Sequence, residues 1–205
     1  MSVQHPVQFK GSALARGLLR LGGWRVIFDG LPTLQGVAVV YPHTSNWDFI
    51  VGILAKWAIG IPAHFWGKDT LFKVPLFGRW LRWVGGLPIE RNAAHGAVGQ
   101  MVDTFEQHRR EGSLLWLGLA PEGTRKRTPG WRSGFYQVAL GAKVPLGIVR
   151  LDWGRRELRF VSFFTPSGDE TADYTRLVEL FEGVRGYHAG QACPIVPWRP
   201  SKDKT

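Results

Sequence analysis

The chain has 205 residues, of which 44% are hydrophobic and 20% charged, so a disordered polyelectrolyte and a fibrous repeat are excluded and one folded domain is expected. Lys and Arg number 26 against 16 Asp and Glu, and the net charge of +10 favours anionic partners: nucleic acid, anionic lipid headgroups or phosphorylated substrates. Cys193 is the single cysteine, which excludes an intramolecular disulfide framework and a cysteine-based zinc site and favours the cytoplasm.

The N-terminal segment, 1–35, is expected to be an amphipathic docking segment. Residues 12–28 place leucines at roughly helical spacing and arginines mostly to one side. This pattern suits a helix that lies in a membrane interface, and equally one that packs on its own domain. Several of the ten tryptophans neighbour basic residues, which is typical of a membrane-surface protein, although core positions are an open alternative. We expect neither a signal peptide nor a spanning helix.

From residue 36 onward, β-prone runs alternate with helical stretches. Strands are expected over 36–41, 63–66, 86–89, 113–119, 146–151 and 157–163. Helices are expected over 47–59, over 71–84 with a break at Pro75, and over 94–110, 134–141 and 169–184. The alternation predicts an α/β fold, a single domain over 36–190 with a mostly parallel sheet flanked by helices. The tail over 191–205 is expected to be loop or disordered.

The first chemical signal follows the strand over 36–41, because functional loops in such a sheet leave the carboxyl ends of the strands. On a continuous helix His43 and Asp48 would point about 140° apart, at about 3.6 residues per turn. With Ser45 or Asn46 as the N-cap, His43 lies in a turn and Asp48 folds back towards the imidazole. Such a pair is a general base with its orienting carboxylate. Alternatively, Ser45 and Asp48 form an ordinary capping box.

Two further segments place basic residues at strand ends. Gly123, Thr124 and Arg125 follow the strand over 113–119 and offer backbone amides, a hydroxyl and a guanidinium group, the equipment for holding a phosphate. Arg91 follows the strand over 86–89 and could bind the same phosphate as Arg125. Taken alone, each segment is also typical of a surface turn whose charges are solvated or paired.

In this order, the segments resemble the sequence blocks of the lysophospholipid acyltransferases, the family of glycerol-3-phosphate and 1-acylglycerol-3-phosphate O-acyltransferases. His43 and Asp48 match the block of a His, four residues and an Asp. The other blocks are matched by Gly85, Ile89 and Arg91, by residues 121–125 (PEGTR), and by residues 144–146 (VPL). The resemblance spans residues 36–150, and the chain departs from the family pattern at Pro42, Glu90, Ala120 and after Leu146.

The resemblance implies a glycerolipid acyltransferase-like fold and an O-acyltransferase that moves a fatty acyl group from acyl-CoA or acyl-carrier protein to a lysophospholipid such as 1-acylglycerol-3-phosphate. His43 and Asp48 would be catalytic, and the acceptor would be held by Arg91, Glu122, Gly123, Thr124 and Arg125. Neither a metal nor an organic cofactor is implied, since the acyl thioester is a substrate. The enzyme would be cytoplasmic and peripheral, at the cytoplasmic face of an anionic membrane.

Two alternatives remain at this point. The acceptor could lack a phosphate, as in a lyso-aminolipid or a glycolipid, or the chain could be a non-catalytic basic protein that binds a membrane surface. Nucleic acid is not expected as a partner, because the charges are dispersed along the chain and no nucleic-acid-binding motif is present.

Overall fold

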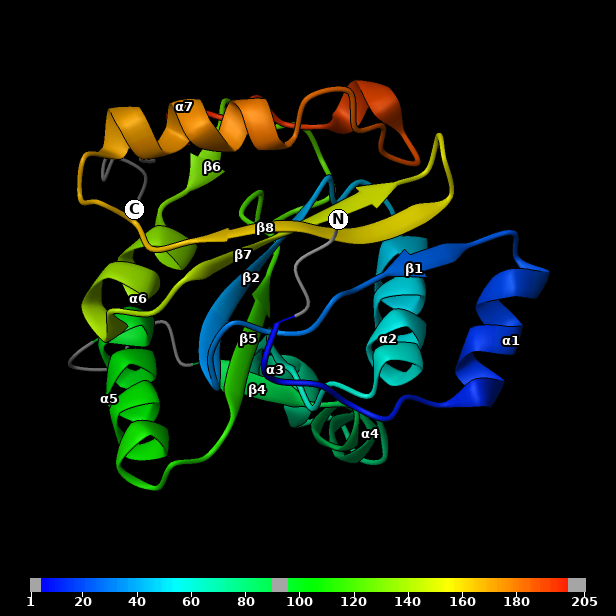
Figure 1. The fold of residues 1–205 in the computed structure, drawn as a ribbon, viewed down its shortest axis with the longest axis horizontal. Helices are drawn as coiled ribbons and strands as arrows, with labels where there is room; N and C mark the ends of the chain where they lie inside the picture. Colours follow the sequence, from blue (N-terminus) through cyan, green and yellow to red (C-terminus); the bar gives the residue numbers. More distant parts are fainter. Residues whose placement is uncertain (1–4, 90–95, 199–205) are drawn as a thin grey trace.

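A central sheet organises the fold, and its seven strands are β1 (Arg25–Ile27), β2 (Gln35–Tyr41), β3 (His64–Lys68), β4 (Gly86–Ile89), β5 (Leu115–Leu119), β7 (Leu146–Asp152) and β8 (Glu157–Phe164). Their order across the sheet is β1-β8-β7-β2-β5-β3-β4 (Figure 1). The computed structural model describes residues 5–89 and 96–198. Neighbouring strands are parallel except β7 and β8, which form an antiparallel pair. The carboxyl ends of β2, β5, β3, β4 and β7 therefore share one edge.

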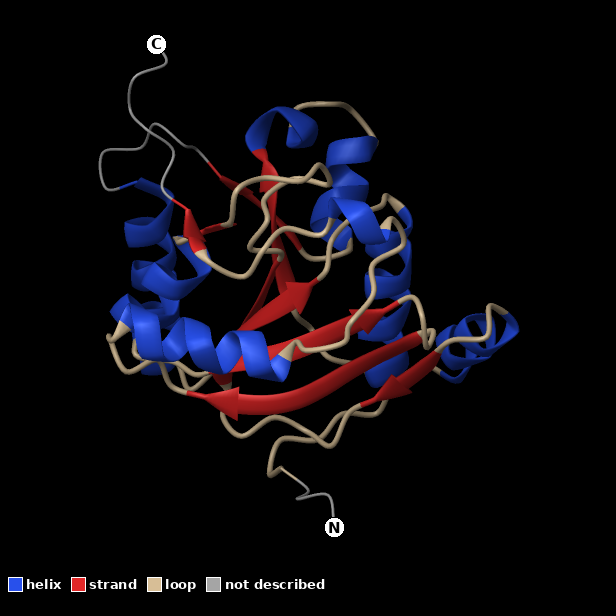
Figure 2. Cartoon of the chain, turned by 90° about the horizontal axis from the view of Figure 1, so that it is seen from above, coloured by secondary structure: helices blue, strands red, loops and turns tan. Residues whose placement is uncertain are grey.

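Helices cover both faces of the sheet (Figures 1 and 2). They are α1 (Ala13–Leu21), α2 (Trp47–Ile59), α3 (Asp69–Phe72), α4 (Phe77–Trp83), α5 (Gly96–Arg110), α6 (Gly134–Ala142), α7 (Glu170–Leu180) and the 3₁₀ helix η1 (Ala189–Gln191). On one face, α5, α6 and α7 pack with Val37 and Val39 of β2, and on the other, α1 and α2 pack with Ala38. Successive strand residues point to opposite faces, so β2 contributes to two cores. No helix in the described ranges is long and apolar enough to cross a membrane.

The α/β architecture predicted from the sequence is confirmed. The helix over 47–59 and the strand over 86–89 have the predicted bounds. α2 ends where it does because Gly60 adopts a φ of 88°, a conformation that residues with a Cβ atom rarely take. The interrupted stretch over 71–84 forms two short helices, α3 and α4, on either side of Pro75.

The shortest strands of the structure differ from the prediction. The amphipathic stretch over 12–28 is helical only as far as Leu21, and residues 25–27 then pair with β8 as a strand. A second, two-stranded sheet joins β6 (Trp131–Arg132) to β9 (Pro197–Trp198) and was not predicted. Strands of two or three residues are too short to show an alternating pattern, so only their partners in space define them.

The C-terminal segment, residues 187–198, returns to the carboxyl edge of the sheet. Burial, with a contribution from Glu122, raises the pKa of Tyr41 to about 12, so its hydroxyl stays protonated and donates to the carbonyl of Cys193 at 3.0 Å. Cys193 itself is buried. The tail expected over 191–205 as loop or disorder is, in its described part, mostly loop that packs on the domain.

Candidate active site

His43 and Asp48 meet in the turn between β2 and α2. Nδ1 of His43 lies 3.2 Å from Oδ2 of Asp48. The His43 side chain is 21% exposed, whereas that of Asp48 is 1% exposed. Because the carboxylate faces Nδ1, it selects the tautomer that carries its proton there and leaves Nε2 as the nitrogen that can accept a proton.

Backbone amides of the same turn hold the carboxylate. The N–H groups of Thr44 and Ser45 donate to Oδ2 of Asp48 at 2.6 and 2.7 Å. Asn46 is the N-cap of α2, in agreement with one of the two predicted caps, but its side chain makes no capping bond. The bond from the Ser45 amide is one half of the predicted capping box. The other half is not formed, because Oγ of Ser45 accepts from the amide of Trp47, while the Asp48 amide donates to the backbone carbonyl of Ser45. The oxygen that holds the Ser45 amide, Oδ2, also faces Nδ1 of His43.

Trp153 bonds the other oxygen of the same carboxylate. Its indole Nε1–H donates to Oδ1 of Asp48 at 2.7 Å. Burial acts to raise the pKa of Asp48, but bonds from His43, the Ser45 amide and Trp153 outweigh it and keep this pKa below its ordinary value. Sequence reasoning did not single out Trp153. The available signal was its position immediately after β7, a parallel neighbour of β2.

Glu122 is a second buried carboxylate beside the turn. It is fully enclosed, and it accepts from the backbone N–H of His43 with Oε2 and from that of Cys193 with Oε1, the latter at 3.0 Å. Burial outweighs these two amide bonds and raises the pKa of Glu122 above its ordinary value. The sequence suggested that Glu122 contacts the acceptor. Its enclosed oxygens contact backbone amides instead, so it joins the His43 turn to the C-terminal segment.

The next residues, 123–127 (GTRKR), form the basic loop. Gly123 has a φ of 64°, and a Cβ atom there would lie 2.9 Å from Cδ of Arg132, so the turn requires glycine. Thr124 is half-buried and its Oγ1 accepts from the amide of Lys126, while Arg125 is exposed. Arg91, the other predicted phosphate ligand, lies outside the described residues.

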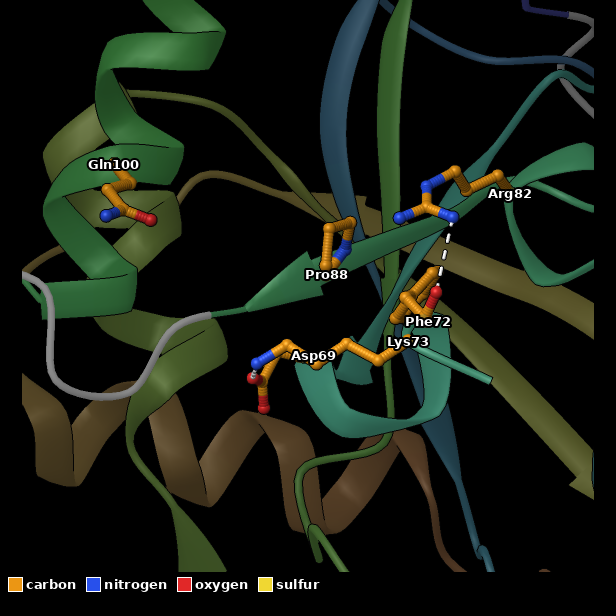
Figure 3. A pocket seen from close by; sticks show the side chains of 6 residues that line it. All are labelled: Asp69, Phe72, Lys73, Arg82, Pro88 and Gln100. Atoms are coloured by element: carbon orange, nitrogen blue, oxygen red, sulfur yellow. Dashed lines mark hydrogen bonds and ion pairs between the residues drawn. The ribbon is translucent and has the colours of Figure 1, made fainter. Parts of the chain in front are cut away.

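A separate cavity of about 320 Å³ lies near the ends of β3 and β4 (Figure 3). Its charged lining includes an ion pair between Lys73 and Asp69 at 3.0 Å and Arg82, which donates to the carbonyl of Phe72. His43, Asp48 and the basic loop do not line it. Within the described residues, no group of three or more His, Cys, Asp or Glu could hold a metal ion.

The lowered pKa of Asp48 predicts how its contribution to stability depends on pH. The ionised carboxylate stabilises the fold above its unfolded-state value of 3.8, and this contribution is lost as the pH falls through the lower folded-state value. The free energy of unfolding of the wild type should therefore exceed that of Asp48→Asn most above about pH 5, and the difference should shrink on acidification. Urea unfolding at a series of pH values measures it. Asp103→Asn, at an exposed position on α5, is the control, and a difference independent of pH would contradict the assignment.

Residues 25–150 match the Acyltransferase family, a range that contains both buried carboxylates and the basic loop. Among solved structures, the chain is similar to the crystal structure of PlsC, the 1-acyl-sn-glycerophosphate (LPA) acyltransferase from Thermotoga maritima. The TM-score is 0.52 and the identity 18%, over 80% of this chain and 72% of that one, which shows a shared fold. Among curated proteins, no sequence matches. Since the family match covers more than half of the chain, the protein belongs to the Acyltransferase family and is an acyltransferase.

Proposed function

We propose that this acyltransferase moves a fatty acyl group from a thioester, acyl-CoA or acyl-carrier protein, to the hydroxyl of a lysophospholipid such as 1-acylglycerol-3-phosphate. The observation that carries the proposal is the 3.2 Å contact between His43 Nδ1 and the buried Asp48 carboxylate, in a chain of this family. The similar PlsC structure is that of a 1-acyl-sn-glycerophosphate acyltransferase, and this acceptor agrees with the proposal.

In the proposed reaction His43 is the general base. Its Nε2 takes the proton of the acceptor hydroxyl as the oxygen attacks the thioester carbonyl carbon. Asp48 keeps the Nδ1 proton in place and stabilises the imidazolium that forms. When the tetrahedral intermediate collapses, the carbon–sulfur bond breaks and the imidazolium returns the proton to the leaving thiolate. The ester and the thiol are the products.

His43→Ala should remove nearly all turnover, because loss of a general base typically costs about 10²–10⁴ in rate. The measurement is transfer of a labelled acyl group from acyl-CoA and from acyl-carrier protein to a panel of lysolipids, followed by identification of the product. His108→Ala, which changes a histidine on α5 bonded to Ser113, is the matched control and should keep turnover near that of the wild type. Wild-type turnover of His43→Ala with every acceptor would show that another group is the base.

We further propose that the basic loop holds the acceptor's phosphate through Thr124 and Arg125, with Arg91 as a second ligand. Arg125 is three residues from Glu122, whose carboxylate bonds the backbone N–H of His43, so loop and base belong to one bonded unit. A guanidinium group binds phosphate through a fork of two hydrogen bonds. The alternative acceptors, a lyso-aminolipid or a glycolipid, offer no phosphate at this point.

Arg125→Ala should chiefly raise the KM for a phosphate-bearing acceptor. A hydrogen bond to a charged group contributes roughly 1.5–3 kcal/mol, so kcat/KM should fall about 10- to 150-fold. Arg125→Lys should recover only part of this loss, and the thioester KM should stay the same. Arg110→Ala, at an exposed arginine on α5, is the matched control. If Arg125→Ala changes nothing, the acceptor without a phosphate becomes the better hypothesis.

We also propose that α1 and α4 contact an anionic membrane. Of the tryptophans, Trp116 and Trp131 are fully buried, but Trp83 is 71% exposed and borders a groove of about 720 Å³ between α1 and α2. The charged residues within 5–28 are all Lys or Arg. Among the described residues, most exposed large hydrophobic side chains lie on α1, on α3 and α4, and in the loop between α3 and α4, namely Leu14, Leu18, Leu21, Leu71, Val74, Leu76, Phe77, Trp80 and Trp83. Apolar side chains flanked by Lys and Arg are typical of a surface that inserts among headgroups.

The double variant Leu14→Ser and Leu21→Ser should bind anionic vesicles about 100-fold or more weakly, because each leucine that the bilayer buries contributes roughly 1.5–3 kcal/mol. Co-sedimentation measures the loss. Val178→Ser, at an exposed apolar residue on α7, should bind as the wild type does. Binding of the wild type should weaken with salt, which screens charges beyond about 8–10 Å. Equal recovery on neutral and anionic vesicles at every salt concentration would contradict the proposal.

A further inference from the structure

We propose that Trp153 is a positioning residue for catalysis, which holds the carboxylate of Asp48 in the orientation that His43 requires. The inference rests on the proposed function, in which these two residues form the general base. Trp153 lies beyond residues 25–150, the range that matches the family.

The indole N–H donates to the oxygen of Asp48 that receives no hydrogen bond from the turn. Oδ2 faces Nδ1 of His43 and accepts from the amides of Thr44 and Ser45, all on one side of the carboxylate. Oδ1 accepts from Nε1 of Trp153 at 2.7 Å. A carboxylate rotates about its Cβ–Cγ bond, so donors on both oxygens fix its plane. With 1% of the Asp48 side chain exposed, solvent has little access to replace the indole.

Trp153 is itself held on two sides. Its ring packs edge-on against Trp24, with centroids 4.8 Å apart, and against Tyr187 at 4.7 Å. Its backbone N–H donates to the carbonyl of Arg185 at 2.8 Å. Three residues further on, His188 donates its backbone N–H to Oγ1 of Thr44 at 3.1 Å. The C-terminal segment therefore supports the indole on one side and the His43 turn on the other.

Loss of the indole N–H would remove a donor that stabilises the negative charge of Asp48. A donor to an anionic oxygen spreads its charge, so without it the carboxylate attracts the imidazolium of His43 more strongly. Among the described residues, titratable or charged groups that bond the pair or adjoin Trp153 include Glu122, Asp152, Arg185, Tyr187 and His188. Trp153→Phe replaces none of these groups.

The test compares Trp153→Phe with the matched control Trp24→Phe, which disturbs the same aromatic cluster but removes no bond to Asp48. Trp153→Phe should lower kcat about 10-fold, the low end for a hydrogen bond to a charged group, with KM values within about twofold. The acid limb of its kcat/KM profile should move to higher pH. In NMR titrations the midpoint of the His43 ring signals should move the same way. Trp24→Phe should reproduce none of these changes.

A second replacement covers the case in which Trp153→Phe does not fold. Benzothiophene in place of the indole keeps the two-ring shape and substitutes sulfur for N–H, so it should give the same shifts. Wild-type kcat and acid limb in either Trp153 variant, or equal effects of Trp24→Phe, would overturn the inference. If no thioester and acceptor pair supports turnover, the proposed reaction fails, whereas a displaced His43 midpoint in the variants would still support the role of Trp153.

Discussion

The carboxylate of Asp48, at the start of α2, joins the turn after β2 to the residue that follows β7. It receives bonds from the turn after β2, from the imidazole of His43 and from the indole that follows β7. A buried carboxylate is costly unless such donors replace its hydration. The donors here come from separate segments, so a low-energy carboxylate requires that β2, α2 and β7 be correctly assembled. The geometry of the base is thereby coupled to the packing of the sheet.

Glu122 makes a comparable junction one strand away, between the His43 turn and the C-terminal segment. The two carboxyl groups nevertheless shift in opposite directions. Asp48 has two amides, an indole and an imidazole as partners, which outweigh its burial, whereas Glu122 has two amides and the Cys193 thiol, which do not outweigh its burial. Desolvation therefore dominates at Glu122. At each carboxyl group, the balance between burial and the number and type of donors decides whether the enclosed acid keeps its charge.

Helix α2 connects the candidate active site to the apolar surface proposed to contact a membrane. Its first turn carries Asp48, and its last turn lies beside α1, where Trp57 packs against Trp83 of α4 at 5.5 Å. If a lipid acceptor reaches the site from a membrane, α2 links the place where it enters to the place where it reacts. Lys56, in that last turn, donates to the carbonyl of Val84 and ties α2 to the end of α4.

Local sequence determined the longer helices and strands of this protein and one part of the site. The period of apolar residues placed α2 and β4, and the cap before α2 predicted that Asp48 folds back towards His43. These features depend on neighbours within a few residues, so a single sequence contains their signal. The bond of Glu122 to the His43 amide, the indole bond of Trp153 and the short strands β1, β6 and β9 join residues far apart in the chain. No local period encodes such pairs, because their partners become neighbours only when the sheet assembles, and the tertiary structure alone decided them.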